Sequence, residues 1–372
     1  MRTKINKFLR EARDYQLAAA GDVFLKTSSN TKPFSDSIQK CFNKAEVQLV
    51  NLETALTDYY YPKKKAFPIQ ANPNMVTRLN DIGHRVIANL ANNHTLDCGQ
   101  VGLQDTVRNL ERLNICHVGV VVNSLPQDPT FIELSSGKLG IIGYTIGNQI
   151  INGIGVATID EVQIIQDIHR VKKMGADWIL VNLHWGVEYT AFPSPSQQRL
   201  AREIIDAGAD IILGSHPHMI QGIEHYKQGI VFYSLGNLNF YTPFDEGYPK
   251  TKWGMIVLIN FGNIGISYEI VPTWTNSNYQ PELMPDSKVS DFKHYLEQIS
   301  IKLIDRIPHL FWLDHASVPY FQSNFRGFKT RIENYGLSHA VAMFKWLFRP
   351  STYLFCLGLL MRAVRSIVGK IR

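Results

Sequence analysis

Short apolar segments, each followed by a side chain that can bind a metal, recur along residues 15–240 of this chain. Segments with helical periodicity separate them, such as residues 160–174, where Ile164 and Val171 fall on the same face. An alternation of strands with amphipathic helices is typical of layered α/β folds, because each element must bury its apolar face against another. The sequence therefore predicts a layered α/β domain over residues 15–280.

Two histidines one residue apart follow the apolar run at residues 209–213. The motif Gly-Ser-His-Pro-His occupies residues 214–218, and Pro217 stiffens the loop between His216 and His218. Imidazole is the commonest metal ligand in proteins, and catalytic groups gather at the carboxyl ends of strands in α/β folds. We therefore interpret the two histidines as metal ligands, with an incidental pair of loop histidines as the alternative.

Four other apolar runs end in the same manner. They lead to Asp22, to Glu53, to Asn93 with His94, and to His184. Two carboxylates, one amide and three histidines form a mixed oxygen and nitrogen set that suits Mn²⁺, Zn²⁺ or Fe. Such a set can hold one ion, or two ions if a carboxylate bridges them. Since two ions activate a shared water and neutralise an oxyanion, we expect a hydrolytic reaction.

The positive charge of the chain is concentrated at its carboxyl-terminal end. Residues 322–372 contain nine Lys or Arg against the single acidic residue Glu333, a net charge of +8, so the other 321 residues sum to −2. The main body is therefore not predicted to bind nucleic acid. A content of 45% hydrophobic and 19% charged residues excludes disorder over most of the chain.

Residues 281–372 are predicted to form an irregular and helical basic region. We expect irregular structure over 281–330 around one helix near 288–306, because four prolines interrupt it. The last segment has helical amphipathicity, with one apolar face made by Leu357, Leu360, Met361, Val364, Ile367, Val368 and Ile371. Neither of the apolar runs at 339–348 and 353–361 reaches the roughly 20 residues that span a bilayer. Two interpretations remain: a basic helix that binds an anionic membrane surface or a partner, or helices that pack against the domain or a second subunit.

The amino-terminal residues 1–14 are predicted to form a short polar helix. Charged residues interrupt this segment before an apolar stretch long enough for a signal peptide develops, so we expect no export signal. The four cysteines lack metal or disulfide spacing and are interpreted as free thiols. We expect a cytoplasmic protein.

Six motifs carry a resemblance to a known family. They are Gly21-Asp22, Asn51-Leu52-Glu53, Leu90-Ala91-Asn92-Asn93-His94 with Leu96-Asp97-x-Gly99, Leu183-His184-Trp185-Gly186-Val187-Glu188-Tyr189, Gly214-Ser215-His216-Pro217-His218 and Tyr233-Ser234-Leu235-Gly236-Asn237. In order and spacing they resemble the CapA family of bacterial poly-γ-glutamate capsule biosynthesis proteins, a branch of the calcineurin-like metallophosphoesterases. The resemblance covers about residues 15–275 and implies a four-layer α/β/β/α sandwich with a dinuclear metal centre.

The resemblance also implies a role for each polar residue. One ion would be held by Asp22, Glu53 and His218, and the other by Glu53, Asn93, His184 and His216. Glu53 would bridge the two ions, and His94 would donate a proton to the leaving group. Asn92, Asp97 and Asn237 are predicted to support these residues from behind.

Two positions depart from the wider superfamily. Phe24 stands where phosphoesterases have a metal-binding histidine, and Glu53 stands where they have aspartate. The first metal site is therefore expected to be one ligand short. The resemblance implies a divalent-metal-dependent hydrolase acting on poly-γ-glutamate or a related surface polymer. The alternatives are a phosphoesterase or nucleotidase, and a non-catalytic binding subunit of a polymer synthesis or export complex.

The expected partners follow from these readings. The substrate is predicted to be an anionic polymer or a phosphate-containing molecule. Residues 339–372 are the candidate contact with the inner face of the membrane or with capsule-synthesis machinery. No nucleic acid is expected, for the reason of charge given above.

Overall fold

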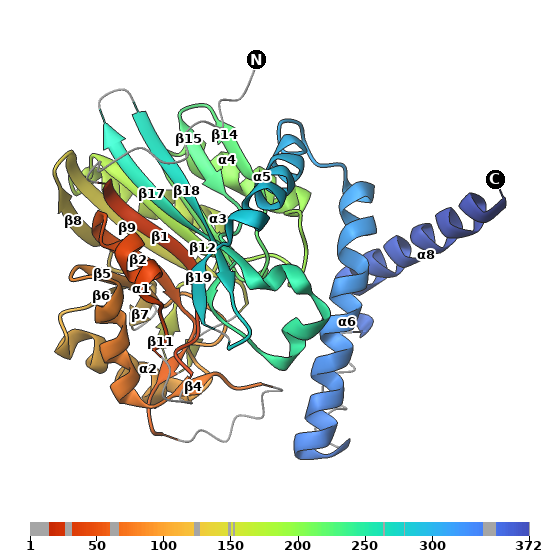
Figure 1. Ribbon diagram of the computed structural model, residues 1–372, viewed down its shortest axis with the longest axis horizontal. Helices are drawn as coiled ribbons and strands as arrows, with labels where there is room; N and C mark the ends of the chain where they lie inside the picture. Colours follow the sequence, from red (N-terminus) through yellow and green to blue (C-terminus); the bar gives the residue numbers. More distant parts are fainter. Residues whose placement is uncertain are drawn as a thin grey trace.

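Two β-sheets stacked face to face form the body of the protein (Figure 1). The computed structural model describes residues 15–26, 32–59, 67–122, 127–147, 150–151, 153–262, 265–278, 280–337 and 347–371. The helix predicted at 1–14 and most of the apolar run at 339–348 lie outside these residues. No helix of the described segments combines the length and apolarity needed to cross a membrane.

Within each of the two sheets, the central strands run parallel to one another. The larger sheet has the order β19 (Pro281–Leu283), β18 (Gly265–Thr275), β17 (Trp253–Gly262), β1 (Tyr15–Val23), β2 (Ala45–Leu52), β5 (Val86–Asn89) and β6 (Cys116–Val118), with β16 (Asn237–Asn239) beside β1. The second sheet has the order β14 (Ile223–Tyr226), β15 (Gly229–Phe232), β13 (Ile211–Ser215), β12 (Trp178–His184), β9 (Gly137–Thr145) and β8 (Thr130–Leu134). In the larger sheet β1, β2, β5 and β6 run parallel, and in the second sheet β9, β12, β13 and β15 do so. The carboxyl ends of these strands therefore lie at one edge of each sheet.

Helices cover the outer face of each sheet. The larger sheet carries α1 (Asp36–Phe42), the 3₁₀ helix η1 (Pro73–Ile82) and α2 (Gly99–Arg112), and the second carries α3 (Glu161–Lys173) and α4 (Pro195–Asp206). Side chains alternate along β1, because successive residues of a strand point to opposite faces. Leu17 and Ala19 pack against the second sheet, whereas Ala18 and Ala20 pack in the cluster that holds α1 and α2. The predicted four-layer α/β/β/α sandwich is confirmed.

Shorter elements connect the main ones. They are β3 (Ala55–Leu56), β4 (Gln70–Ala71), β7 (Val120–Val122), β10 (Ile150–Ile151), β11 (Ile154–Val156), η2 (Pro243–Gly247) and η3 (Pro249–Lys252). The helix predicted at 160–174 is confirmed as α3, and the Asp160 side chain caps its first turn. Ser194 and Gln197 form a capping box that starts α4.

The carboxyl-terminal region is more regular than the sequence suggested. The helix expected near 288–306 is present as α5 (Asp286–Ile301), and β19 extends the larger sheet past the predicted boundary at 280. The expectation of irregular structure up to residue 330 was wrong, because α6 (His309–Tyr335) runs through it with Pro319 inside the helix. The helix tolerates this proline because tertiary packing holds it: Leu313 and Ala316 are fully buried in the core beside α4.

A last helix, α8 (Pro350–Ile371), packs on α6 and leads away from the sandwich (Figure 1). Phe355 stacks on Tyr320 with ring centroids 3.9 Å apart, and Thr352 shares a hydrogen bond of 2.9 Å with the same tyrosine. Gly358 lies so close to Ser317 that a Cβ atom there would sit 2.0 Å from the serine Oγ. One face of α8 is therefore fixed against α6.

We expect Gly21→Ala to destabilise the protein by about 3 kcal/mol, because an added methyl group overpacks a filled interior. A Cβ at Gly21 would lie 1.8 Å from the carbonyl oxygen of Gly236, directly beside Asp22. Urea unfolding measures the change. Gly262→Ala is the matched control, since the nearest atom of the described residues, the carbonyl oxygen of Gly265, would lie 3.7 Å from its Cβ. Equal losses in the two variants would contradict this account.

Candidate metal centre

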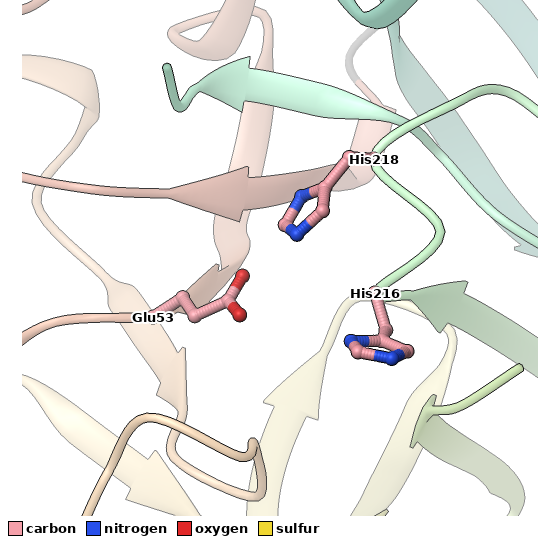
Figure 2. A group of neighbouring side chains, drawn as sticks. All are labelled: Glu53, His216 and His218. Atoms are coloured by element: carbon pink, nitrogen blue, oxygen red, sulfur yellow. The ribbon is translucent and has the colours of Figure 1, made fainter. Parts of the chain in front are cut away.

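Five of the predicted ligands converge where the two sheets meet. Asp22 lies near the end of β1, Glu53 follows β2, His184 ends β12, and His216 and His218 follow β13. Figure 2 shows the side chains of Glu53, His216 and His218 pointing toward a common space. Ligand atoms of Glu53, His216 and His218 lie within 4.8 Å of one another, and so do those of Asp22, Glu53 and His184. These clusters have the composition of a metal site.

The two clusters share Glu53 but group the histidines differently from the sequence-based assignment. That assignment put His218 with Asp22 and His184 with His216. The contacts are compatible with both groupings, because His218 Nδ1 lies 3.4 Å from Asp22 Oδ2 and the rings of His184 and His216 are 4.7 Å apart. The allocation of ligands to individual ions therefore stays a prediction.

Asn93 and His94 reach the same centre from the loop after β5. The Asn93 Oδ1 atom lies 2.7 Å from His184 Nε2. His94 Nε2 lies 3.7 Å from Glu53 Oε1, and His94 Nδ1 lies 2.6 Å from Asp97 Oδ2. The structure thus brings together every residue that the sequence selected as a ligand or proton donor.

The three predicted supporting residues also contact this group. Asn92 donates to the carbonyl oxygen of Leu52 at 2.8 Å and accepts from the backbone N–H of His94, which joins two of the loops. Asp97 holds the His94 ring as described, and Asn237 Oδ1 lies 3.0 Å from His218 Nδ1. Carboxylate and amide oxygens in such positions fix the orientation of imidazole rings.

Two asparagines at the centre were missed by the sequence-based selection. Asn51 Nδ2 donates to Asp22 Oδ1 at 2.7 Å and lies 3.2 Å from His184 Nδ1, and its Oδ1 accepts from Asn89 at 2.8 Å. The sequence could have indicated Asn51, because it stands two residues before Glu53 and side chains two residues apart in a strand point to the same face. Asn89 becomes recognisable only through strand register, which pairs it with Asn51.

The loop after β13 has an unusual backbone. His216 and His218 have φ angles of 95° and 56°, a region that residues other than glycine rarely adopt. The carbonyl oxygen of Pro217, between them, accepts a hydrogen bond of 2.8 Å from the N–H of Tyr189. Backbone strain of this kind persists where the surrounding structure holds it and concentrates at functional sites.

Burial sets the electrostatics of the centre. Glu53 is fully buried, and among the described residues neither of its carboxylate oxygens accepts a hydrogen bond. Burial, and then the nearby charge of Asp22, raise the pKa of Glu53 well above its usual value. Burial lowers the pKa of His216 to about 4, which keeps this imidazole neutral and able to bind a metal. A bound cation would compensate the buried carboxylates, so the residues present fit a divalent metal ion.

A cavity of about 280 Å³ opens beside the centre. Asn93, His94, Glu188 and His218 line its polar side. Phe67, Ile69, Phe240 and Phe244 form an apolar wall, and Ser323, Gly327 and Arg331 of α6 close a third side. A substrate in this cavity would contact the predicted ligands, an apolar surface and α6 together.

Position 24 offers no ligand to this centre. Phe24 is buried with Phe240 and Ile69 in a small apolar cluster, and its ring lies 6.0 Å from that of Phe240. The Phe240 ring in turn stacks on His218 with centroids 4.3 Å apart. The face of His218 toward Phe240 and Phe24 is therefore packed with aromatic rings, which offer no metal ligand.

Comparison with known sequences identifies the family. The sequence model described as bacterial capsule synthesis protein PGA_cap matches residues 13–242, well over half of the chain. The protein belongs to this family of bacterial capsule synthesis proteins, and the predicted CapA membership is confirmed.

Two curated relatives carry similar names. The capsule biosynthesis protein CapA of Bacillus anthracis is 33% identical over 225 residues, which cover 57% of this chain and 53% of the relative. The PGA biosynthesis protein CapA of Bacillus subtilis is 31% identical over 245 residues, which cover 63% of each chain. This chain thus spans between half and two thirds of the length of these relatives.

Among solved structures, the calcineurin-like phosphoesterase YfkN from Bacillus subtilis is similar, with a TM-score of 0.41 and 15% identity. The match covers 76% of this chain and 98% of that one.

We expect purified protein loaded with Mn²⁺ or Zn²⁺ to retain between one and two ions per chain. Six candidate ligands can hold two ions when one of them, a carboxylate, is shared by both. Glu53→Gln and the double variant His216→Ala with His218→Ala should lose most of this metal, because each removes ligands from the shared cluster. Elemental analysis after gel filtration measures the content. His294→Ala on the exposed side of α5 is the control. Full metal content in the double variant would show that the ions bind elsewhere.

Proposed function

We propose that the protein is a divalent-metal-dependent hydrolase that acts on poly-γ-glutamate or a related surface polymer during capsule biosynthesis. The observation that carries this proposal is the buried carboxylate of Glu53, which accepts no hydrogen bond from the described residues, is shared by two ligand clusters and faces His94 beside a cavity. Membership of the capsule synthesis family supports the choice of polymer. The name of the Bacillus subtilis relative, a PGA biosynthesis protein, points the same way.

The proposed cofactor is one or two ions of Mn²⁺, Zn²⁺ or Fe. Its ligands would be Asp22, Glu53, Asn93, His184, His216 and His218. When bound, such ions polarise the carbonyl of a scissile bond and lower the pKa of a water molecule. The borderline softness of three imidazoles with carboxylate oxygens favours these metals over Mg²⁺ or Ca²⁺, which prefer oxygen ligands alone.

His94 is the residue that we propose moves a proton. Its Nδ1 atom lies against Asp97, whose carboxylate fixes the ring and stabilises the imidazolium form. Its Nε2 atom lies on the side of Glu53 and the cavity. A protonated Nε2 can therefore donate to the leaving amine of an amide bond as that bond breaks.

We expect His94→Ala to lower turnover by roughly 10² to 10⁴-fold, the contribution of a positioned general acid. The metal content should be unchanged, since Glu53 and the three ligand histidines remain. A chromatographic assay of γ-linked polyglutamate cleavage, run beside metal analysis, measures both quantities. His294→Ala is again the control. Unchanged turnover in His94→Ala would exclude this residue as the proton donor.

The same assay separates the alternative functions. Faster cleavage of a chromogenic phosphodiester than of the polymer would favour a phosphoesterase, although Phe24 removes a ligand that phosphoesterases use. Binding of the polymer by wild type and His94→Ala, with no turnover by either, would favour a non-catalytic subunit of a synthesis or export complex.

We further propose that α8 rests on an anionic membrane surface. Three side chains of its predicted apolar face are exposed, with Leu357 43%, Leu360 62% and Val364 51% accessible, and Met361 of the same face is half-buried. The opposite face packs on α6, as Phe355 and Gly358 do. An apolar helix face within a segment of net charge +8 suits the interface of an anionic bilayer. The cytoplasmic location expected from the sequence stays a prediction.

Liposome flotation tests the role of α8. We expect the full chain to float with vesicles of anionic phosphatidylglycerol, and Leu357→Glu with Leu360→Glu to remain in the soluble fraction because the acidic side chains face the lipid. The control is Ile304→Glu, which changes a side chain that is 66% exposed between α5 and α6. Equal flotation of the α8 double variant and the control would exclude α8 as the membrane contact. A smaller particle size of the α8 double variant than of wild type would instead indicate that α8 binds a second copy of the protein.

A further inference from the structure

The cavity at the metal centre has one wall from outside the segment that matches the family. The match ends at residue 242, whereas Ser323, Gly327 and Arg331 of α6 line the cavity. These three residues are four positions apart, so they lie on one stripe of the helix. Gly327 carries no side chain, which leaves space between the hydroxyl group and the guanidinium group. The wall therefore presents two polar side chains to the cavity, one on each side of a glycine.

Three polar contacts dock α6 on the loops around the site. The Ser323 hydroxyl donates to the Glu188 carboxylate, which lies four residues after His184. The Arg326 Nη1 atom donates to the carbonyl oxygen of Phe244 at 2.7 Å. The hydroxyl of Tyr248 donates to Gln322. Both Glu188 and Phe244 line the cavity, so α6 is joined directly to its other two sides.

The first half of α6 is anchored in the protein core. Leu313 and Ala316 are fully buried in the cluster that contains α3 and α4, and Trp312 is 8% exposed. The Phe355 ring of α8 packs on Trp312 at 5.3 Å. The position of the stripe over the cavity is therefore set by the fold rather than by the polar contacts alone.

Arg331 gives the cavity a group that recognises anions. A guanidinium is planar, always charged and pre-organised to bind a carboxylate through two hydrogen bonds. The apolar wall of Phe67, Phe240 and Phe244 suits a short hydrocarbon stem. Each unit of a γ-linked glutamate chain offers this combination, because its α-carbon carries a free carboxylate and two methylene groups of the main chain follow it.

We infer that α6 is the substrate-selecting wall of the metal centre and that Arg331 binds an α-carboxylate of the polymer next to the bond held at the ligand cluster. Lys329, two residues earlier on the same helix, points away: its side chain is 78% exposed and its Nζ atom lies 3.8 Å from Glu333. The identity of the bound polymer rests on the proposed function, whereas the anion site itself rests on the cavity and α6.

The first test compares two probes by isothermal titration calorimetry with the Mn²⁺-loaded full chain. The probes are γ-linked triglutamate and the same peptide with its carboxylates converted to carboxamides. We expect wild type to bind the carboxylate form at least tenfold more tightly, and Arg331→Gln to lose this preference. Lys329→Gln should keep it, and Arg331→Lys should keep part of it, since the charge stays but the planar fork is lost. A full preference in Arg331→Gln would overturn the inference while leaving the polymer assignment intact.

A second probe, glutarate, separates the anion site from the polymer. Glutarate carries two carboxylates and no amide bond, so its binding does not depend on the proposed reaction. If wild type binds neither peptide, the polymer assignment fails. A tenfold weakening of glutarate binding by Arg331→Gln would still support the anion site, and unchanged glutarate binding would overturn it. Equal metal content and equal melting temperatures in the variants exclude loss of the fold as the cause.

Discussion

The structure depends on a carboxylate buried where two sheets meet. Glu53 is fully buried near Asp22 and accepts no hydrogen bond from the described residues. A charge in this environment is costly unless it is neutralised or paired, and burial accordingly raises the pKa of Glu53. Proteins keep such a group where a cation compensates it. Ligand atoms of His216 lie within 4.8 Å of Glu53 in one cluster and those of His184 do so in the other, so both imidazoles are candidate partners of a cation beside this carboxylate.

The scaffold around this carboxylate is built to hold these partners in place. Parallel strands from both sheets end at the same region, so short loops suffice to bring their side chains together. Behind the ligands, Asn51 and Asn89 form a hydrogen-bonded pair across β2 and β5 that reaches Asp22 and His184. The left-handed backbone at His216 and His218 is held by the hydrogen bond from the Tyr189 N–H to the carbonyl oxygen of Pro217. Rigid strands, buried amides and a strained loop together position the site before any substrate arrives.

The carboxyl-terminal helix α6 forms one wall of the cavity beside this centre. The segment that matches the family supplies the two clusters of candidate ligands and the proposed proton donor, whereas α6 contributes one wall of the cavity. Because α6 is anchored in the core at one end and contacts Glu188 at the cavity, changes in this helix alter the cavity without altering the ligands. The same helix carries α8, which connects the region of the site to an exposed apolar and basic surface. The substrate selection that we propose for α6 and the membrane contact that we propose for α8 thus both lie outside the segment that matches the family.

The sequence alone determined the layered fold and selected the candidate ligands and proton donor that converge at the centre. Apolar periodicity is local, so alternation of strands and helices and the polar residue after each strand are visible in the chain itself. Tertiary structure decided what local patterns do not encode. Strand register paired Asn51 with Asn89. Core packing stabilises α6 as a helix that includes Pro319, where the prolines had suggested irregular structure. Arg331 lines the cavity together with segments more than a hundred residues away in the sequence, such as those of His94 and Glu188. Such long-range placement arises only when the whole chain packs.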